Sequence, residues 1–488
     1  MYFCRMVLMR RLFAFTLILL ISKSGVVLAQ NNSENAGSTA WTLEACIERA
    51  LQKNLNVMDQ EIGILRAENA LNQDRLDRYP TLNASASHNY NFGRTIDPFT
   101  NQFVNQSIQS NNFSLTSGVT IYNGKRITNT IARSENEVQR SRFQSDVTRN
   151  SIGLSVADAF LQIIFAKQQL QNFEEINKAT KTQLEQAKSR YEAGVVNQRQ
   201  YINLKAQDAR DMMNIQSAKG SLELAYVRLK QLLLLEPNEN IEIELPEVGV
   251  PALDKEWIVA AVVQNAMELM PDMKLAESQK RSADLTQEIS KSGLYPRLTA
   301  FANVNTLYSG SRLERINEQK FTQAIGYVES NPTEVVVSEF TRYDTRVTAF
   351  GQQLKDNFGQ AAGLSVSVPV FNNNQARAAI EDAKLASLQA INNIERTRQS
   401  IQSSVVQAYT DFLNARSNYL AALENQKAQK ENYDFVLKSS EAGVATVADM
   451  VLALNDYNVA KNDLLRAEYQ YIYADVILSF YNTGSIEL

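Results

Sequence analysis

The chain is poor in the residues that build most catalytic and metal sites. Its 488 residues include one histidine and two cysteines, and they contain no CxxC pair, glycine-rich phosphate loop or GxSxG motif. The histidine, His88, falls on the apolar side of an alternating segment, where a surface or interface position is more common than a metal ligand. We therefore expect no enzymatic activity, no metal and no cofactor.

Internal disulfide bonds are also excluded if the chain is exported. The first 29 residues have the pattern of a signal peptide, with Cys4 in its positively charged part. The pattern consists of three arginines, an apolar run and a small-residue cleavage site: Arg5, Arg10, Arg11, residues 12–21 and Val27-Leu28-Ala29. The run is about half the ~20 residues of a membrane-spanning helix. Cleavage would leave Cys46 alone, so packing or oligomerisation must supply stability.

Neither an excess of positive charge nor a second long apolar run is present. Removal of four of the 49 basic residues with the signal leaves 45 against 53 acidic residues, a net charge of −8. A nucleic-acid partner would require a basic patch, so we expect none. No other stretch approaches 18 consecutive apolar residues. The mature chain is then either soluble or crosses a membrane as strands.

The chain is a tandem duplication, which its rare residues reveal. The only tryptophans, Trp41 and Trp257, are 216 residues apart, and the same offset relates Tyr79-Pro80 to Tyr295-Pro296. Repeats of this kind fix the architecture before any other feature.

A second offset locates an insertion. The segment Glu192-Ala193-Gly194-Val195 recurs 249 residues later as Glu441-Ala442-Gly443-Val444, so 33 residues have been added to the second copy, between about residues 308 and 363. We assign residues 1–29 to the signal peptide, 30–236 to the first repeat and 237–256 to a proline-rich linker. Residues 257–488 form the second repeat, with an enlarged extracellular loop at about 309–363.

Proline is absent from 123–236 and from 370–488, and both stretches are rich in good helix formers. Apolar residues recur there at three and four residue spacings: Ile152, Val156, Ala159, Phe160, Ile163 and Ile164, then Ile401, Val405, Ala408, Tyr409 and Phe412. Such narrow seams are typical of coiled-coil-like assemblies. Gly194 and Gly443 each follow an asparagine, Asn123 or Asn372, by 71 residues, which predicts rods of about 100 Å. The chain then returns as helices over 198–235 and 447–480.

Before each rod the apolar period changes from helical to alternating. The alternating positions predict four strands of about ten residues: Leu82 to Phe92, Phe113 to Ile121, Leu298 to Val304 and Leu364 to Val370. A half-buried soluble sheet and a transmembrane β-barrel both show this pattern, and the context favours the barrel. The preceding helices end at the Tyr-Pro pairs, and polar loops over 93–112 and 309–363 join the strands. Four strands cannot close a barrel, so two, three or four copies must associate.

These features together resemble the outer membrane efflux proteins, the TolC-like channels, from Trp41 to about Tyr481. The resemblance rests on YPTLNA at 79–84, YPRLTA at 295–300, GLSVSVPVFN at 363–372 and the Ala-Gly turns. It implies an α+β membrane protein: a homotrimer with a twelve-stranded barrel in outer membrane lipid and helical hairpins forming a periplasmic α-barrel. It also implies a passive exit duct that docks onto a periplasmic adaptor and an inner-membrane pump.

The resemblance also assigns residues at the hairpin ends. By position, the adaptor-docking tips are Ala193, Gly194, Val195, Val196, Ala442, Gly443, Val444 and Thr446, and the candidates for the entrance constriction are Asp449, Arg190, Tyr191 and Gln200. Three copies of Asp449 around an axis would attract cations; an ordinary solvated aspartate is the alternative. The sequence departs from the family pattern at Gln200, where the first copy has no acid, and at Ser440 and Ala445.

A periplasmic adaptor or scaffold is the competing interpretation, since such proteins also contain long helical hairpins. An adaptor would have one hairpin flanked by separate β-domains. Here strand pairs lie between helices in both halves of the chain, which favours the channel.

Overall fold

The computed structural model describes residues 41–96, 101–105, 107–244, 249–442 and 444–486, in two units. The predicted signal peptide lies outside the described residues. In the smaller unit, Met1–Thr42 with Asn240–Glu244, the Trp41 N–H donates to the Glu242 carbonyl (2.8 Å) and the Glu244 N–H donates to the Trp41 carbonyl (2.9 Å). All helices and strands named below belong to the larger unit.

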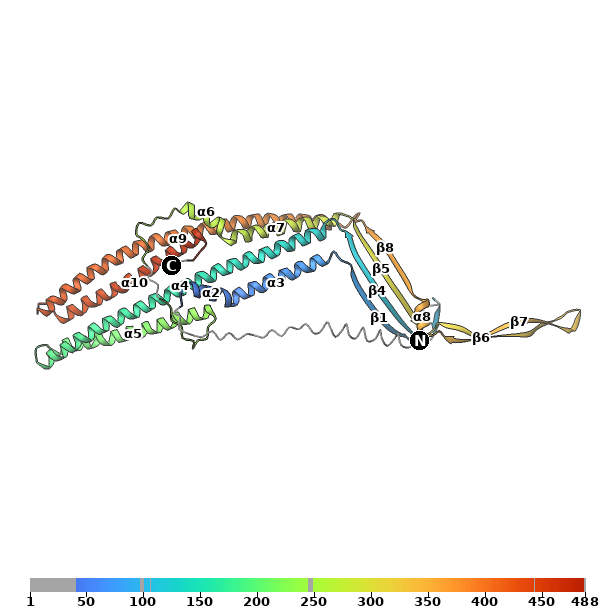
Figure 1. Ribbon diagram of the computed structural model, residues 1–488, viewed down its shortest axis with the longest axis horizontal. Coiled ribbons are helices and arrows are strands. Elements are labelled where there is room, and N and C mark those ends of the chain that lie inside the picture. Colours follow the sequence, from blue (N-terminus) through green and yellow to red (C-terminus); the bar gives the residue numbers. More distant parts are fainter. Residues whose placement is uncertain (1–40, 97–100, 106, 245–248, 443, 487–488) are drawn as a thin grey trace, which may run out of the picture. The chain divides into compact units, whose positions relative to one another are not determined.

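The larger unit repeats one order of elements twice (Figure 1). The first copy contains α2 (Leu43–Lys53), α3 (Leu55–Leu76), β1 (Thr81–Asn91), β4 (Ile108–Tyr122), α4 (Arg126–Glu192) and α5 (Gln198–Leu233). The second contains α6 (Val259–Leu269), α7 (Pro271–Lys291), the short 3₁₀ helix η1 (Ser292–Leu294), β5 (Arg297–Ser309), β8 (Gly359–Ser367), α9 (Gln375–Glu441) and α10 (Val447–Thr483). Because α4 and α9 have 67 residues each, the internal repeat is confirmed.

The four strands form one antiparallel sheet in the order β1-β4-β5-β8. Its register keeps side chains of like polarity on one face. Apolar rungs join Ala84, Leu115 and Val304, and Val119, Ala300 and Leu364; polar rungs between them join Asn83, Thr116 and Asn303, and Ser85, Ser114 and Asn305. The sheet therefore has one apolar and one polar face, as the alternation predicted. Within the described chain, no strand pairs with the outer edge of β1 or of β8.

Three strands differ from the prediction in their bounds. β5 runs to Ser309, beyond Val304. β4 begins at Ile108 rather than near Phe113, because the buried Ile108 extends the ladder to Asn91 at the end of β1. β8 covers Gly359–Ser367, so it starts earlier and stops before Val368. Pro369 accounts for the early end, since proline has no N–H to donate to a ladder.

The loops expected between the paired strands also contain regular structure. The second holds a long hairpin, β6 (Leu313–Val328) with β7 (Asn331–Val347), followed by the short helix α8 (Phe350–Asp356); the first holds β2 (Arg94–Ile96) and β3 (Phe103–Asn105). The prediction of a polar loop over 309–363 missed this hairpin. The run Val335-Val336-Val337 has strong strand propensity, but interspersed charges obscure the alternation.

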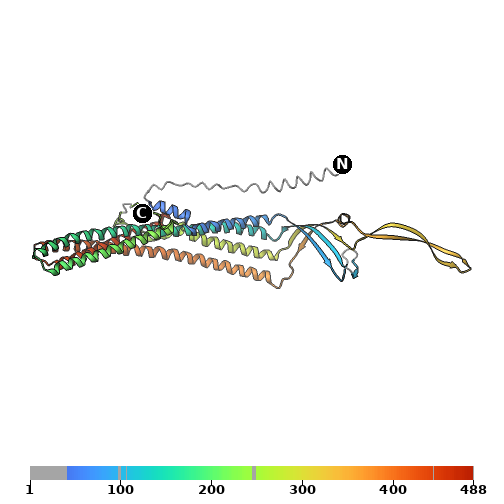
Figure 2. The same cartoon turned by 90° about the horizontal axis from the view of Figure 1, so that it is seen from below.

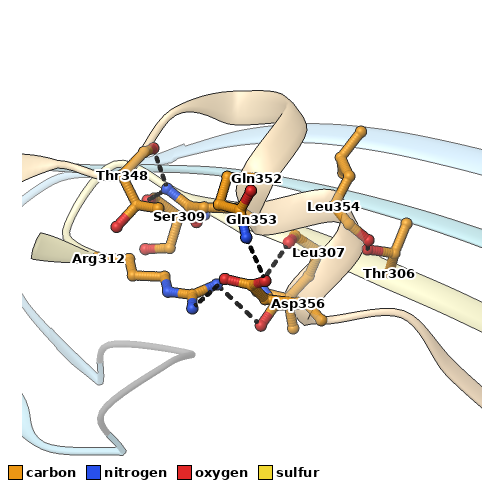
Figure 3. Close-up of polar contacts among 10 residues, drawn as sticks. Thr306, Leu307, Ser309, Arg312, Thr348, Gln352, Gln353, Leu354 and Asp356 are labelled. Carbon is orange, nitrogen blue, oxygen red and sulfur yellow. Dashed lines mark hydrogen bonds and ion pairs between the residues drawn. The ribbon is translucent and has the colours of Figure 1, made fainter. Parts of the chain in front are cut away.

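A buried glutamine fixes the base of this hairpin (Figure 3). The Gln353 side chain on α8 is fully buried. It accepts a hydrogen bond from the Ser309 N–H (2.9 Å) and donates to the carbonyls of Ser309 (3.0 Å) and Thr348 (2.8 Å). Arg312 forms an ion pair with Asp356 at 2.7 Å. α8 is thereby attached to the end of β5 where the insertion leaves the sheet.

The helices follow the strand order. α3, α4, α7 and α9 pack successively side by side, while α4 with α5 and α9 with α10 form hairpins (Figures 1 and 2). The predicted seams are confirmed: every seam residue is buried except Tyr409, which is half-buried. Among the described residues, no helix is both long and apolar enough to cross a bilayer.

A second-copy core lies where α6, α9 and α10 meet. It includes Val405, Phe412, Tyr471 and Leu478, all at most 1% exposed. Trp257 packs against this cluster, and its indole N–H donates to Asp475 at 3.1 Å. Lys255 pairs with the same carboxylate at 2.7 Å, so the tryptophan that marks the repeat is held by packing and by hydrogen bonding.

Each rod begins at a tight turn that follows a strand. The central residues have positive φ in both copies: 63° and 65° at Gly124 and Lys125, and 51° and 63° at Asn373 and Asn374. This is the type I′ pattern, which favours glycine and asparagine. The first turn is more crowded, because a Cβ on Gly124 would lie 2.7 Å from the Tyr295 Cβ.

We predict that the two turns respond differently to exchange of their residues. Gly124→Asn keeps a residue that tolerates positive φ but forces its Cβ against Tyr295, so it should cost about 1–3 kcal/mol. Asn373→Gly removes a side chain and should change stability by less than about 1 kcal/mol. Thermal unfolding of the detergent-solubilised protein measures both, and equal melting temperatures for the two variants would contradict the packing argument.

Candidate functional site

The first hairpin tip is a compact turn built around Gly194. α4 ends at Glu192, and Gly194 has a φ of 70°, a conformation that costs glycine little. The carbonyl of Arg190 accepts from the N–H groups of Val195 (2.9 Å) and Val196 (3.4 Å). Nothing lies within 4 Å of a Cβ added at Gly194. The tip therefore presents bare backbone and an exposed Val195.

The second tip has the same hydrogen bonds around the equivalent residues. The carbonyl of Ser439 accepts from Val444 (2.8 Å) and Ala445 (3.1 Å), and the Ala442 N–H bonds to the end of α9. Val444 is 84% exposed. Gly443 lies outside the described residues. The two tips thus share one pattern of backbone hydrogen bonds.

Asp449 is part of a helix cap at this tip. Its carboxylate accepts from the Thr446 N–H (3.0 Å) and hydroxyl (2.6 Å), and its own N–H donates to that hydroxyl (3.2 Å). This reciprocal arrangement is a capping box. The hydrogen bond from the Thr446 side chain, with one from its backbone, lowers the pKa of Asp449. The carboxylate is exposed at the start of α10 and ionised at neutral pH.

The remaining entrance candidates lie at the first tip. Arg190 and Tyr191 are exposed in the last turn of α4, and the Gln200 N–H is capped by the Asn197 side chain at 3.0 Å. The Tyr191 ring stacks on Tyr201, with centroids 5.8 Å apart. Among the described residues, Asp449 has no ion pair with Arg190. The expected candidates therefore form two separate groups, one at each tip.

Polar contacts behind the tips join the two hairpins, and sequence reasoning missed them. Gln207 on α5 and Asn455 on α10 exchange side-chain hydrogen bonds of 2.8 and 3.3 Å. Gln183 donates to the Tyr433 hydroxyl at 3.2 Å. A cluster of buried apolar residues lies in the same region: Ala187, Leu204, Met450 and Val451. The sequence signal for these contacts is the presence of amide side chains, Gln207 and Asn455, among the apolar residues of α5 and α10.

A buried carboxylate accompanies this network. Asp211 is 3% exposed and accepts from the Thr180 hydroxyl (2.6 Å) and the Gln207 amide (2.8 Å). Burial raises its pKa, and the two hydrogen bonds oppose that shift. These bonds satisfy the carboxylate, so its evident role is structural.

Elsewhere the described residues contain little reactive chemistry. They contain no group of three or more histidine, cysteine, aspartate and glutamate side chains that could hold a metal ion. His88 lies on the exposed β1 strand and hydrogen bonds to Asn111. Burial raises the pKa of Cys46 to about 12, which leaves this thiol protonated and unreactive.

The comparison with protein families decides the assignment. The model of a family described as "Outer membrane efflux protein" matches residues 46–233 and 262–481, more than half of the chain. The chain belongs to this family. Membership also confirms the outer membrane as its location, and the family is one of channels rather than enzymes. The strand pairs in both copies set it apart from the adaptor or scaffold considered above.

Curated relatives and solved structures agree with this assignment. Outer membrane protein TolC of Escherichia coli (strain K12) is 22% identical over 344 residues, 69% of this chain and 61% of TolC. The chain thus spans about three fifths of the length of the curated relatives it matches. CusC superposes with a TM-score of 0.71 at 13% identity, covering 91% of this chain and 92% of CusC. VceC from Vibrio cholerae gives 0.69 at 14%, covering 91% and 97%. The α+β fold expected from the resemblance is confirmed.

We predict a pH-dependent loosening at the second tip only. The pKa of Asp449 is lower in the folded state than in the unfolded state. The ionised carboxylate therefore stabilises the start of α10 above the unfolded pKa, and this stabilisation is lost as the pH falls through the folded pKa. Amide exchange at the start of α10, corrected for intrinsic rates, should therefore accelerate below about pH 4.

Asp449→Ala should remove this step and give faster exchange at neutral pH than the wild type, although the Thr446 hydroxyl still caps the helix. The start of α5, capped by the uncharged Asn197, is the internal control and should show no step. The same pH response at both helix starts would contradict the assignment to Asp449.

Proposed function

We propose that this chain is the outer membrane channel of a tripartite efflux or secretion system. It would form a passive exit duct from periplasm to exterior, with energy supplied by an inner-membrane pump through a periplasmic adaptor. We expect no catalytic activity from the channel itself. The observation that carries the proposal is the four-stranded sheet, which has one apolar face and, within the described residues, two unpaired edges.

Lipid is the environment that suits the apolar face. Leu82, Leu364 and Val366 on this face are each at least 65% exposed in the single chain. Exposed aromatic residues lie near both ends of the strands: Tyr79, Tyr122 and Tyr295 beside the helices, and Tyr90 and Phe92 at the opposite end. An apolar band between two aromatic girdles is the pattern of a transmembrane barrel.

The unpaired edges call for further copies of the chain. Open edges are not tolerated in lipid, because unpaired N–H and C=O groups there cost several kcal/mol each. Pairing β8 of one copy with β1 of the next would satisfy them. The family resemblance favours three copies, hence twelve strands, over the two or four that closure alone allows.

The hairpin tips are the proposed docking surface for the adaptor. They lie at the end of the long helices farthest in sequence from the strands, and both expose a valine beside a backbone turn. In this arrangement three copies of Asp449 would border the periplasmic entrance, with Arg190, Tyr191 and Gln200 from the first tip. The carboxylate is exposed and its pKa is lowered by the Thr446 hydrogen bonds, so the charge is present at neutral pH.

We predict a trimer that conducts ions. Native mass spectrometry of the protein extracted in mild detergent from outer membranes should give three copies, because edge pairing closes only in the assembly. Planar bilayers containing that trimer should show discrete channel openings. A monomer in mild detergent, or recovery of the chain in the soluble periplasmic fraction, would exclude the proposed barrel.

We also predict that the tips are needed for export but not for assembly. Valine at both Gly194 and Gly443 adds bulk to the two tips and should abolish dye efflux from cells that lack their own copy. At Gly194, where φ is 70°, it also costs about 1–2 kcal/mol. Trimers should still form, since the tips are remote in sequence from the strands.

Asparagine at the same two positions is the matched control. It tolerates positive φ, so retained efflux would mean that turn geometry matters, and lost efflux would mean that docking needs a surface without side chains. Normal efflux by the valine variant would rule out the tip assignment.

A further inference from the structure

A polar pocket lies where the sheet meets the helices. It has a volume of about 750 Å³ and is lined by residues of α3, α4, α7, β4 and β5 and by residues at and after the end of β8. Its charged lining consists of Arg126, Arg133, Arg297, Asp74 and Asp77. Neither the tips nor the sheet edges involve these residues.

The register places this pocket on the polar face of the sheet. Arg297 pairs with Ser367, and Thr120 pairs with Thr299 two residues further along β5. Because side chains alternate along a strand, these residues share one face, opposite the apolar rung that contains Ala300. Arg297 also hydrogen bonds to the Thr120 hydroxyl at 3.4 Å. In the proposed channel the polar face borders the lumen.

The arginines in this pocket are not neutralised by its acids. Asp74 hydrogen bonds to Ser134, and Asp77 accepts from Gln73 at 3.4 Å. In the described part of the chain, none of the three arginines forms an ion pair with either aspartate or with any other acid. Arg126 is also the first residue of α4, where the helix dipole adds positive potential. The pocket therefore has a net positive charge.

Comparison of the two copies shows that the fold does not require these arginines. The residues equivalent to Arg126 and Arg133 are Gln375 and Asp382, and β1 begins with Thr81 where β5 begins with Arg297. The same type I′ turn and the same long helix form without them. Their positive charge is therefore an addition to the architecture.

We propose that this pocket is a lumenal binding site for the anionic group, a carboxylate, sulfate or phosphate, of a soluble compound in transit. The proposal rests on the channel function above. Arginine presents a rigid fork of donors that matches such oxyanions, and rings of basic side chains select anions in other pores. Three copies would place nine arginines around the duct, above an entrance that carries aspartates.

The test is single-channel recording of the full trimer with citrate as the probe. Wild-type channels in neutral phosphatidylcholine bilayers should be blocked by citrate in a saturable way. The triple variant R126Q/R133Q/R297T should bind citrate about tenfold or more weakly and shift the KCl reversal potential toward cation selectivity. Two of these changes copy the equivalent residue of the other repeat, Gln375 for Arg126 and Thr81 for Arg297, so the local fold should survive. The singles R126Q and R297T provide the same readout if the triple assembles poorly.

A matched control lies on the other side of α4. Arg142 is nine residues, or about two and a half helical turns, from Arg133, so the two residues lie on opposite sides of α4. Arg142 lines a separate groove with Arg75 and Arg281. R75Q/R142Q/R281Q removes equal charge and should leave the citrate block unchanged. Equal block in wild type and pocket variant, or equal loss in both triples, would overturn the proposal.

Lipid is the other source of phosphate near this junction. Repeating the recordings with phosphatidylglycerol in the bilayer separates the two, because a lipid headgroup in the pocket would compete with citrate. Unchanged block supports the soluble ligand, and weakened block assigns the pocket to lipid instead. Absence of any conductance in wild type would contradict the channel function itself, a result distinct from conductance without block.

Discussion

The outer edges of β1 and β8, which no strand in the described part of the chain pairs with, are the constraint on which the rest of the structure depends. Each edge presents a row of backbone N–H and C=O groups. In water these groups can form hydrogen bonds with solvent, but in lipid they cannot. The apolar face that runs across all four strands makes water an unfavourable environment for the same sheet. Pairing with further copies satisfies both requirements, because it closes the edges and leaves the apolar face toward lipid.

The strand order also determines how the helices are arranged. α3 leads into β1, β4 leads into α4, α7 leads into β5, and β8 leads into α9. The packing order α3, α4, α7, α9 therefore repeats the strand order. If β8 pairs with β1 of the next copy, α9 must come beside α3 of that copy. Exposed apolar side chains on these two helices, Leu385, Leu388 and Ile391 on α9 and Met58, Ile62 and Leu65 on α3, are available for that contact.

Much of this architecture could be predicted from the sequence, because it depends on periodicity. Alternation from Leu82 reflects the different polarity of the two faces of a strand, which the register of the sheet confirms. The spacing of Val156, Phe160 and Ile163 reflects burial on one face of a helix, and all three are buried. The β6-β7 hairpin was missed because charges interrupt its alternation. The Gln353 contact with Ser309 joins positions 44 residues apart, and single-sequence patterns do not contain such pairings. The cap formed by Asp449 is visible in the sequence as the capping-box pattern Thr446-x-x-Asp449.

Comparison of the two copies separates what the fold needs from what it merely tolerates. The start of α5 is capped by the Asn197 side chain, which accepts from the Gln200 N–H. The start of α10 is capped by Thr446 in the same way, and Asp449 adds a back-bond to the Thr446 N–H. Since an uncharged cap suffices in the first copy, helix formation alone does not account for the acid. The same comparison identifies Arg126, Arg133 and Arg297 as additions to the duplicated fold. In the proposed channel, charge of opposite sign therefore lies at two levels, aspartate at the tips and arginine where the helices meet the strands.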